Sequence, residues 1–427
     1  MKSVVYSYQS LMFLYRILSI LLLPIISVYM LFRLFQKKES ITSVLHKFTI
    51  QQSKVPNKQV IWFHAASVGE VNIVIPLVKK IVSERSDLHC LVTTITQTSA
   101  GILESSKIKN TTHQFLPLDI SFIINRFLRH WNPKVAVFIE SEFWPNIINQ
   151  TVKNIPILLF NGRFSDASYR RWKRYKKFIS KLLEKFLLIF SASELDYSRF
   201  ANFTQNNLKF IGNFKYSAPT LTYSTKYINL LKEKLKNKSV FIAASTHSGE
   251  EKIIFEAHKR VKKQIPDLFT IIIPRHPNRI EEIKASAQRY QLDFIQDIND
   301  FKEGNELLLV AGFGILGNFF HFTEIVFIGG SLVNIGGHNI LEPAKLGAAI
   351  IIGPYFSNFR EIVEEFDKEN AICIAKKVED FESKLLNLFQ NLEYRKQLIF
   401  NAKNISKKHA NISQMAIEAI YNYIQKK

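Results

Sequence analysis

The sequence predicts an α/β fold of two doubly wound, Rossmann-like domains that face each other across a cleft, preceded by an apolar N-terminal helix. The prediction rests on two series of short apolar runs that alternate with helical patterns of roughly 10–18 residues. Continuously apolar strands that alternate with helices indicate parallel sheets covered on both faces. Residues 215–238, between the two series, are polar and rich in lysine, which indicates a linker between domains.

The apolar runs also predict the domain boundaries. We assign residues 1–36 to the N-terminal helix, 37–218 to the first domain and 219–427 to the second, with a final helix that is free to pack back on the first domain. The predicted strands are 60–66, 88–95, 135–141 and 155–161 in the first domain, and 239–245, 269–275, 306–311, 324–330, 348–354 and 371–375 in the second.

Composition limits the class of protein. The 427 residues suit two or three domains, and the hydrophobic content of 47% excludes general disorder. The net charge of +21 implies an anionic partner, which can be nucleic acid, acidic lipid or a phosphorylated substrate. The two cysteines lie in apolar runs and form neither a disulfide framework nor a zinc spacing, so we expect an intracellular main body.

The N-terminal segment is expected to contact a membrane. Residues 17–32 carry no charge, and widening the segment to 11–35 admits only Arg16 and Arg33. This length is slightly short of the about 20 apolar residues of a full span, so a spanning anchor, a deep interfacial helix and a buried core helix all stay open. More basic residues follow the segment than precede it, which predicts a body on the cytoplasmic side.

Acidic residues follow two strands of the first domain, at the strand ends where doubly wound sheets bind ligands. Glu70 comes after Gly69 at a strand-to-helix turn. Glu140 and Glu142 are two residues apart, so both side chains point to one face if the strand continues. Two carboxylates at such a point need a function or a cation, because burying them alone is costly.

Groups suited to a phosphate follow the strands of the second domain. Arg275 stands between Pro274 and His276-Pro277, a rigid frame that favours a bidentate phosphate contact. Residues 336–337 are both glycine and precede a predicted helix start, where free N–H groups can meet an anion.

Three familiar nucleotide signatures are missing from the sequence. There is no G-x-x-x-x-G-K-[ST] and no G-x-G-x-x-G after the first strand, which disfavours P-loop enzymes and dinucleotide oxidoreductases. Residues 312–317 fit G-x-G-x-x-G by spacing only. No D-x-D occurs, so we predict a site without metal, in which arginine, lysine and helix dipoles meet the phosphate charge.

Seven motifs in order resemble those of the 3-deoxy-D-manno-octulosonic acid (Kdo) transferases of Gram-negative bacteria, glycosyltransferase family 30. The resemblance runs from about residue 11 to the C-terminus. It implies a membrane-anchored enzyme of the GT-B fold, with an acceptor-binding first domain and a CMP-sugar-binding second domain. The motifs are FHAASVGE (63–70), ESEFWPN (140–146), NGRFSD (161–166), GNFKY (212–216), AASTHSGEE (243–251), PRHPNR (274–279) and GGHNILEPAKLG (336–347).

The resemblance also implies a reaction and its partners. Such an enzyme moves Kdo from CMP-Kdo to the lipid A precursor, lipid IVA, with inversion, at the cytoplasmic face of the inner membrane. It needs no cofactor, touches anionic membrane lipid and does not bind nucleic acid. Two other functions stay open: a GT-B enzyme that uses a UDP-sugar, and a membrane-tethered, non-enzymatic binder of nucleic acid or anionic lipid.

By the same resemblance, Glu70 is the proton acceptor, Glu140 and Lys215 act on the reacting sugar, and Glu142 supports them. Asn339 is an amide donor to the phosphate, and Glu342 accepts from the ribose hydroxyls. The full set of predicted substrate-binding residues is Pro274, Arg275, Phe313, Gly314, Ile315, Asn339, Ile340, Leu341 and Glu342.

Plainer interpretations remain beside these roles. Glu70 can do no more than interact favourably with the dipole at the N-terminus of its helix. Glu140 and Glu142 can form a salt bridge with Arg163, and Lys215 can be a solvated surface cation. Residues 336–337 can form a purely structural turn.

Two segments need separate interpretation. Residues 311–315 read AGFGI where the family has an Asp-Thr-Met-Gly-Glu-like stretch, so only Gly314 is kept and only backbone contacts to the cytosine are supported. Residues 163–177 hold seven Lys/Arg and one Asp with interleaved aromatics. We interpret them as an interface helix on anionic lipid that also holds the phosphates of a lipid acceptor; a solvated helix face and a nucleic-acid patch are the alternatives.

Overall fold

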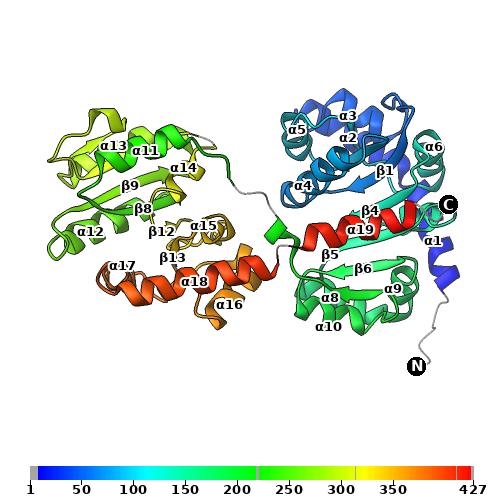
Figure 1. Cartoon of the computed structure of the whole chain (residues 1–427). Coiled ribbons are helices and arrows are strands. Elements are labelled where there is room, and N and C mark those ends of the chain that lie inside the picture. Colours follow the sequence, from blue (N-terminus) through cyan, green and yellow to red (C-terminus); the bar gives the residue numbers. More distant parts are fainter. Residues whose placement is uncertain (1–7, 218–220, 313, 410, 425–427) are drawn as a thin grey trace. The chain divides into compact units, whose positions relative to one another are not determined.

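The computed structural model describes residues 8–217, 221–312, 314–409 and 411–424. The chain divides into two compact units, unit 1 with residues 1–218 and 409–427 and unit 2 with residues 219–408. Each unit is an α/β domain built on one parallel sheet (Figure 1). The predicted fold class of two doubly wound domains is therefore confirmed.

Unit 1 contains a seven-stranded sheet in the order β3-β2-β1-β4-β5-β6-β7, in which all neighbours are parallel. The order reverses direction between β1 and β4, and ligands of such sheets bind at that reversal. The strands are β1 (Gln59–His64), β2 (Leu88–Thr94), β3 (Thr111–Phe115), β4 (Val135–Ile139), β5 (Ile157–Gly162), β6 (Leu188–Ser191) and β7 (Leu208–Phe210).

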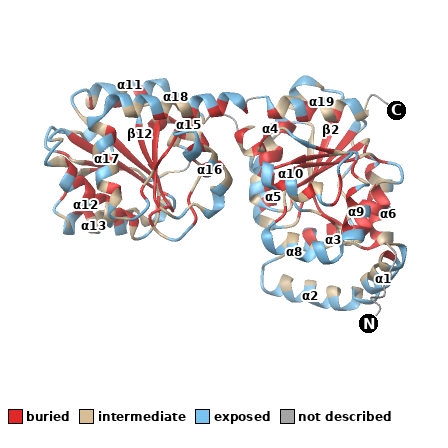
Figure 2. Ribbon diagram, turned by 90° about the horizontal axis from the view of Figure 1, so that it is seen from below, coloured by how far each residue is buried: buried red, intermediate tan, exposed pale blue. Residues whose placement is uncertain are grey.

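Helices cover both faces of this sheet (Figure 2). Aromatic side chains are part of the buried core beneath them. The Trp62 ring lies 4.9 Å from Phe127 and 5.2 Å from Phe138, centroid to centroid. The helices are α3 (Ile41–Lys47), α4 (Val68–Glu84), α5 (Gln97–Ser105), α6 (Ser121–Trp131), α7 (Pro145–Thr151), α8 (Asp166–Arg174), α9 (Lys176–Leu183), α10 (Glu194–Ala201) and α19 (Ile412–Ile424).

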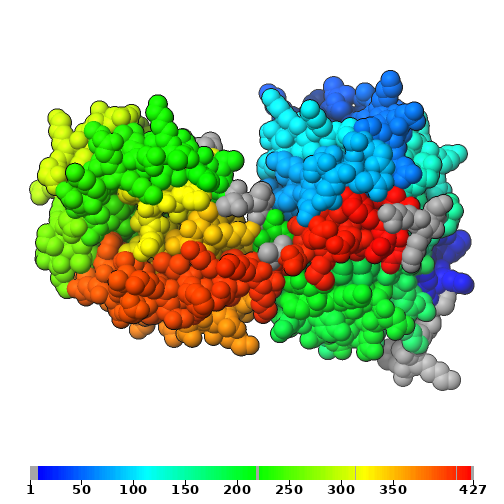
Figure 3. Space-filling model, viewed as in Figure 1, coloured from blue at the N-terminus to red at the C-terminus, as the bar shows by residue number. Residues whose placement is uncertain are grey.

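The last helix of the chain, α19, is part of unit 1, although residues 219–408 belong to unit 2. It contacts α4 and β4, and its apolar face is buried at Ile412, Ala416, Ile417 and Ile420. The space-filling view shows it in red between the blue and the green segments of unit 1 (Figure 3). Unit 1 is thus completed by residues from both ends of the chain.

Unit 2 contains a second seven-stranded sheet, in the order β10-β11-β9-β8-β12-β13-β14, again with parallel neighbours. Its order reverses between β8 and β12. The strands are β8 (Ser239–Thr246), β9 (Leu268–Pro274), β10 (Phe294–Ile295), β11 (Leu307–Leu309), β12 (Ile325–Ile328), β13 (Ala349–Ile352) and β14 (Cys373–Ile374). The helices are α11 (Thr225–Lys234), α12 (Glu250–Lys262), α13 (Ile280–Arg289), α14 (Leu316–Phe320), α15 (Leu341–Leu346), α16 (Arg360–Lys368), α17 (Asp380–Gln390) and α18 (Leu392–Lys408).

The predicted linker, residues 215–238, is wrong over most of its length. Residues 214–217 form a short 3₁₀ turn of unit 1, and α11 is a helix of unit 2. Ile228 and Leu231 of that helix, and Leu235 directly after it, are buried, because a spacing of three and four residues aligns them on one side. The surrounding lysines hid this pattern in the sequence.

The N-terminal segment forms two helices, α1 (Tyr8–Leu21) and α2 (Leu23–Phe35), which are bent by 50° at their junction. Among the described residues, neither these helices nor any other alone is long and apolar enough to cross a membrane, although the bent pair reaches that size and composition. Thirteen large apolar side chains between Phe13 and Phe35 are exposed, and Phe35 is 87% exposed. The pair therefore presents an apolar surface that unit 1 does not cover.

Candidate active site

Glu70 lies in the first turn of α4, immediately after β1. Ser67 begins the helix, with its Oγ 3.3 Å from the Glu70 N–H. The Glu70 carboxylate accepts from the Ala66 N–H at 2.8 Å and from the Ser67 hydroxyl at 2.9 Å. Glu70 thus caps its own helix, as the plainer interpretation expected, and it is only 6% exposed.

Burial raises the pKa of Glu70 to about 7. The Ala66 and Ser67 hydrogen bonds oppose the rise, and the negative charges of Glu142 and Glu140 add to it. A carboxyl group with a pKa near 7 can exchange a proton at physiological pH, which a helix cap does not require.

Glu140 does not extend β4, contrary to the prediction that Glu140 and Glu142 share one face of a continued strand. The strand ends at Ile139, and Glu140 takes a left-handed conformation with φ of 59°. Its carboxylate accepts from the Asn161 side-chain N–H at 3.3 Å and lies 4.0 Å from the Arg163 guanidinium. The predicted contact of Glu140 with Arg163 is therefore present, whereas Glu142 turns elsewhere.

Asn161 connects Glu140 to the segment that carries Lys215. The Phe214 N–H donates to the Asn161 side-chain oxygen at 3.2 Å, and Lys215 follows directly in the same 3₁₀ turn. Asn161 also has a positive φ, 55°, although it lies in β5. Left-handed residues at neighbouring strand ends cost about 1–3 kcal/mol each and tend to cluster at functional sites. Sequence reasoning did not assign Asn161 to the site.

Glu142 is held by two rings. It accepts from His64 Nε2 at 3.1 Å and from the Trp144 indole N–H. His64 is fully buried at the end of β1, and its Nδ1 lies 3.1 Å from the Thr93 hydroxyl of β2. Burial favours a higher pKa for Glu142, but the hydrogen bond and charge of His64 outweigh it, and the pKa of Glu142 is lowered. Glu142 therefore stays ionised near Glu70. His64 was not predicted.

Two of the predicted nucleotide residues of unit 2 lie at the end of β9. Pro274 is the last residue of that strand, and the Arg275 N–H donates to the Thr246 carbonyl of β8 at 3.0 Å. The Arg275 side chain is exposed. Arg279 is different: it holds Glu251 through two contacts, at 2.8 and 3.1 Å, and so braces the segment against α12.

The segment from Asn339 to Glu342 forms the start of α15. The Asn339 amide donates to Glu342 at 3.1 Å and accepts the Leu341 N–H at 3.1 Å. Ile340 and Leu341 are buried, so they offer backbone rather than side chains. Burial raises the pKa of Glu342, while Asn339, Lys345 and the positive charge of Arg275 lower it. Arg275 and Glu342 are thus electrostatic neighbours in unit 2.

The segment after β11 is described only in part, because Phe313 lies outside the described residues. Gly314 is exposed with φ of 73°, and Ile315 is half-buried. The segment shares its sheet edge with β9, since β11 and β9 are neighbours. Gly314 and Ile315 make no hydrogen bond to residues 339–342 in the described part of the chain.

The glycine-rich loop after β12 is organised by a buried carboxylate. Glu250 accepts from four backbone N–H groups, and three of them belong to this loop. The carboxylate thereby fixes the start of this loop against the residues that follow β8. Gly336 and Gly337, both with positive φ, lie further along the loop. The four donors are His247, Gly330, Ser331 and Leu332, at 2.7–3.0 Å. Glu250 was not predicted as a site residue.

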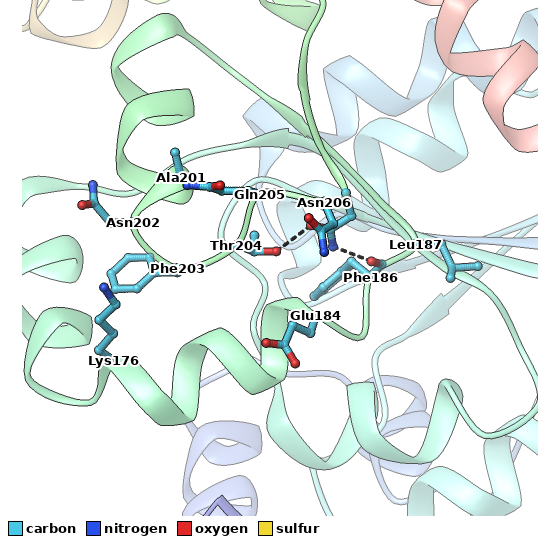
Figure 4. Close-up of a pocket in the computed structure, with 11 residues that line it drawn as sticks. Lys176, Glu184, Phe186, Leu187, Ala201, Asn202, Phe203, Thr204, Gln205 and Asn206 are labelled. Atoms are coloured by element: carbon cyan, nitrogen blue, oxygen red, sulfur yellow. Dashed lines mark hydrogen bonds between the residues drawn. The ribbon is translucent and has the colours of Figure 1, made fainter.

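A polar pocket in unit 1 lies away from these groups (Figure 4). It is lined mainly by residues 201–207 together with Lys176, Glu184, Phe186 and Leu187. These residues precede β6 and β7, so the pocket opens at the amino ends of the strands, opposite the edge that carries Glu70. Asn207 closes a turn there by donating to Phe186 and Leu183 carbonyls. Within the described residues, no cluster of three or more His, Cys, Asp or Glu side chains suits a metal ion.

Comparison with solved structures first defines the fold. A crystal structure of a glycosyltransferase from Rickettsia africae matches with a TM-score of 0.57 at 14% identity, covering 87% of this chain and 100% of that one. The likeness shows the fold, a pair of doubly wound domains of the kind found in glycosyltransferases.

Sequence comparison then gives the family. The family model for 3-deoxy-D-manno-octulosonic-acid transferase (kdotransferase) matches residues 42–218. The 3-deoxy-D-manno-octulosonic acid transferase of Rickettsia bellii is 39% identical over 89% of this chain and 90% of that protein. The transferase of Haemophilus influenzae is 31% identical over 81% and 83%. The chain belongs to the Kdo transferase family of glycosyltransferases.

Proposed function

We propose that this protein transfers Kdo from CMP-Kdo to the lipid A precursor, lipid IVA, with inversion at the anomeric carbon. The observation that carries the proposal is Glu70, a buried carboxyl group with a pKa of about 7 at the reversal of the unit 1 sheet, in a chain of the Kdo transferase family. A buried carboxyl group at this position meets the need of a glycosyl transfer for a proton acceptor.

In the proposed reaction, an acceptor hydroxyl attacks the anomeric carbon of Kdo. A carbon–oxygen bond forms to the acceptor while the bond from that carbon to the phosphate oxygen breaks, and CMP leaves with the electron pair. Glu70 accepts the hydroxyl proton. Attack from the side opposite the leaving group gives inversion in one step and needs no covalent enzyme intermediate.

Charged groups of both units serve the other steps. Lys215, tied to Glu140 through Asn161, is suited to the carboxylate of Kdo, and Glu140 to the positive charge that develops on the sugar. Arg275, exposed at the end of β9, is suited to the phosphate. Asn339 and Glu342 are suited to the phosphate and the ribose hydroxyls.

We further propose that the protein acts at the cytoplasmic face of the inner membrane. The exposed apolar side chains of α1 and α2 support this, since water would have to solvate them otherwise. Helix α8 adds exposed basic residues that suit anionic lipid, and Tyr8 of α1 packs on Phe178 of α9, the next helix along the chain. The lipid acceptor would be taken from the same membrane.

CMP release tests the donor and the acceptor together. The full-length protein is incubated with CMP-Kdo in the presence and absence of lipid IVA, and CMP is quantified by chromatography. The proposal predicts release that depends on the acceptor. UDP-N-acetylglucosamine in place of CMP-Kdo should give no UDP; release of UDP instead would assign the chain to another donor. If neither CMP nor UDP is released, the protein is a non-enzymatic binding protein.

A further inference from the structure

Two histidines meet where the unit 2 sheet reverses its strand order. His247 directly follows β8, and His338 lies in the loop between β12 and α15. Their Nε2 atoms are 2.7 Å apart, which is hydrogen-bond distance. The pair therefore occupies the place at which doubly wound sheets bind ligands, although sequence reasoning assigned no role to either side chain.

The two rings lie edge to edge. Their centroids are 5.0 Å apart and their planes differ by only 11°. Because the centroid distance exceeds the distance between the nitrogens by about two ring radii, the Nε2 atoms point at each other in nearly one plane. In this arrangement one ring donates its N–H directly to the nitrogen of the other, so a single proton is shared between the two Nε2 atoms.

The shared proton decides what the Nδ1 atoms can do. When the pair is neutral, one Nδ1 carries a proton and the other is an acceptor. When one more proton binds, both Nδ1 atoms become donors and the pair carries a single positive charge. Neither Nδ1 has a hydrogen-bond partner within the part of the chain that the structure describes, and both side chains are only half-buried. Both nitrogens are therefore open to a ligand.

The surrounding backbone holds the rings in this position. Gly330 has no side chain, and a Cβ atom there would lie 3.2 Å from Cδ2 of His338. The buried Glu250 carboxylate accepts from the His247 N–H at 2.9 Å and from the Gly330 N–H at 2.7 Å. One carboxylate thus joins the end of β8 to the loop after β12, so the pair is set before any ligand arrives.

The groups that face the pair are mostly basic. Arg275 and His276 act on both rings, and the His276 ring meets His247 edge-on at 5.6 Å. Arg279 and Glu251 also act on His247, but they neutralise each other in an ion pair. Burial is the main cause that lowers the pKa of both histidines, and the basic groups around them add to it, so the free pair is neutral at pH 7.

We propose that His247 and His338 form the phosphate-recognition element of the nucleotide site, and that the pair takes up one proton from solvent when a nucleotide monophosphate binds. The proposal rests on the proposed use of CMP-Kdo as donor, because transfer of Kdo releases CMP as the second product. A phosphate has acceptor oxygens only. It is therefore repelled by an unprotonated Nδ1 but accepts hydrogen bonds from two Nδ1–H groups. Its negative charge also offsets the repulsion between the added proton and Arg275.

Calorimetry of CMP binding tests the proposal. The full-length protein in detergent is titrated with CMP at pH 7.5 in three buffers with different ionisation enthalpies. The slope of the observed enthalpy against the ionisation enthalpy counts the protons that are taken up. We expect uptake that approaches one proton in the wild type, and weaker CMP binding as the pH rises further, because the proton becomes harder to acquire.

Three variants separate the pair from other sources of protons. His247→Gln and His338→Gln should each abolish the uptake and weaken CMP about 10- to 100-fold, as expected for a lost charge-assisted contact. Cytidine, which lacks the phosphate, should bind all proteins equally and without uptake, and this also shows that the variants are folded. His321→Gln is the matched control, since this half-buried histidine of unit 2 contacts Tyr223 instead.

The outcomes are distinct. Proton uptake that persists in both variants assigns the proton to another group and overturns the proposal. CMP binding without uptake in the wild type also overturns it, while the proposed donor stands. If the wild type binds UDP but not CMP, the proposed donor itself is wrong, and the phosphate role of the pair must then be tested with UDP in the same variants, where unchanged affinity rejects it.

Discussion

Glu70 combines a helix cap with an environment that a cap does not need. Its oxygens accept from Ala66 and Ser67, as the first turn of a helix requires. A residue that served only this purpose would be better placed in water, where it stays ionised and interacts favourably with the helix dipole. Burial beside Glu142 instead makes its charged form unfavourable. Such an arrangement lowers stability and is expected where a proton must be accepted.

The first prediction concerns the rate. Glu70→Gln keeps the size of the side chain but cannot accept a proton, so turnover should fall by about 10²–10⁴-fold while CMP affinity is unchanged. In the wild type, kcat should rise with pH through about 7, as the base ionises, and this limb should be missing in the variant. Glu84→Gln, at the other end of α4, is the control and should behave as wild type. A raised KM with kcat preserved would show that Glu70 only positions the acceptor.

The second prediction concerns stability at the same residue. The pKa of Glu70 is raised from 4.5 in an exposed state to about 7 in the folded state, so the folded protein gains stability from the protonated form below pH 4.5 and loses it as the pH rises through 7. Glu70→Gln should therefore stabilise unit 1 by about 1–3 kcal/mol at pH 8 and have no effect near pH 4. Thermal melts at both pH values measure the difference. Equal destabilisation at both would indicate a purely structural residue.

The positions of single candidate residues at strand ends were predictable where a motif carried them. Glu70, Glu140 and Arg275 stand at strand ends that the apolar runs already mark. His64 and His338 were missed because their partners are remote: 78 residues separate His64 from Glu142, and 91 separate His247 from His338. Their roles arise from the neighbouring positions of β1 and β4, and of β8 and β12, which no local pattern contains.

At the scale of the element, α1 is attached to unit 1 through polar contacts. One stripe of α1 contacts the start of α7 and Asp119 just before α6, whereas Phe13, Leu14 and Leu18 are exposed. Tyr15 donates to Asp119 at 2.7 Å, and the same carboxylate accepts the Ile147 N–H of α7 at 2.7 Å. The other contacts of the stripe are Tyr8 to Asn149, Asn149 to Met12 and Asn146 to Ser19.

The third prediction tests this attachment. Asp119→Ala removes the acceptor for Tyr15 and for the first N–H groups of α7, so unfolding of unit 1 should become easier by about 2–4 kcal/mol. Asp87→Ala, which removes an exposed ion pair with Arg85, is the control and should leave the midpoint nearly unchanged. Denaturant unfolding followed by tryptophan fluorescence measures both, since all described interactions of Asp119 lie in unit 1. Equal midpoints would mean that α1 and α7 are held by apolar packing alone.

Elements were predictable where they are long and apolar. Strands β1, β2, β8 and β9 start or end within two residues of the predicted runs. Strand β3, with the sequence TTHQF, was missed because it is polar and lies at the sheet edge, where one side of the ladder is unpaired. The predicted continuation of β4 to Ser141 failed because Glu140 leaves the strand in a left-handed conformation, which sequence patterns do not report.

At the scale of the molecule, each unit has a hydrophobic core of its own, and α19 closes unit 1 from the far end of the chain. The groups proposed to bind the nucleotide lie in unit 2, whereas α1, α2 and α8 belong to unit 1. Membrane attachment and nucleotide binding should therefore be separable by mutation.

The fourth prediction tests that separation. Deletion of residues 1–36 removes the exposed apolar surface, so the protein should leave membranes in 1 M salt while its affinity for CMP is unchanged. At low salt, the basic face of α8 should keep a fraction of the truncated protein bound to anionic vesicles. The double substitution Arg171→Glu and Lys173→Glu in the truncated protein should release this fraction. Sedimentation with vesicles measures all arms. A truncated protein that still sediments wholly in high salt would show that another surface holds it.

The most direct test of the proposed transfer is the mass of the lipid product. Lipid IVA is incubated with CMP-Kdo and the full-length protein, and the lipid is analysed by mass spectrometry over time. The account predicts product masses higher by one or more whole Kdo residues with the wild type, and hardly any with Glu70→Gln. Unmodified lipid IVA in the presence of wild-type protein that binds CMP would contradict the proposed acceptor, and equal products from both proteins would contradict the role of Glu70.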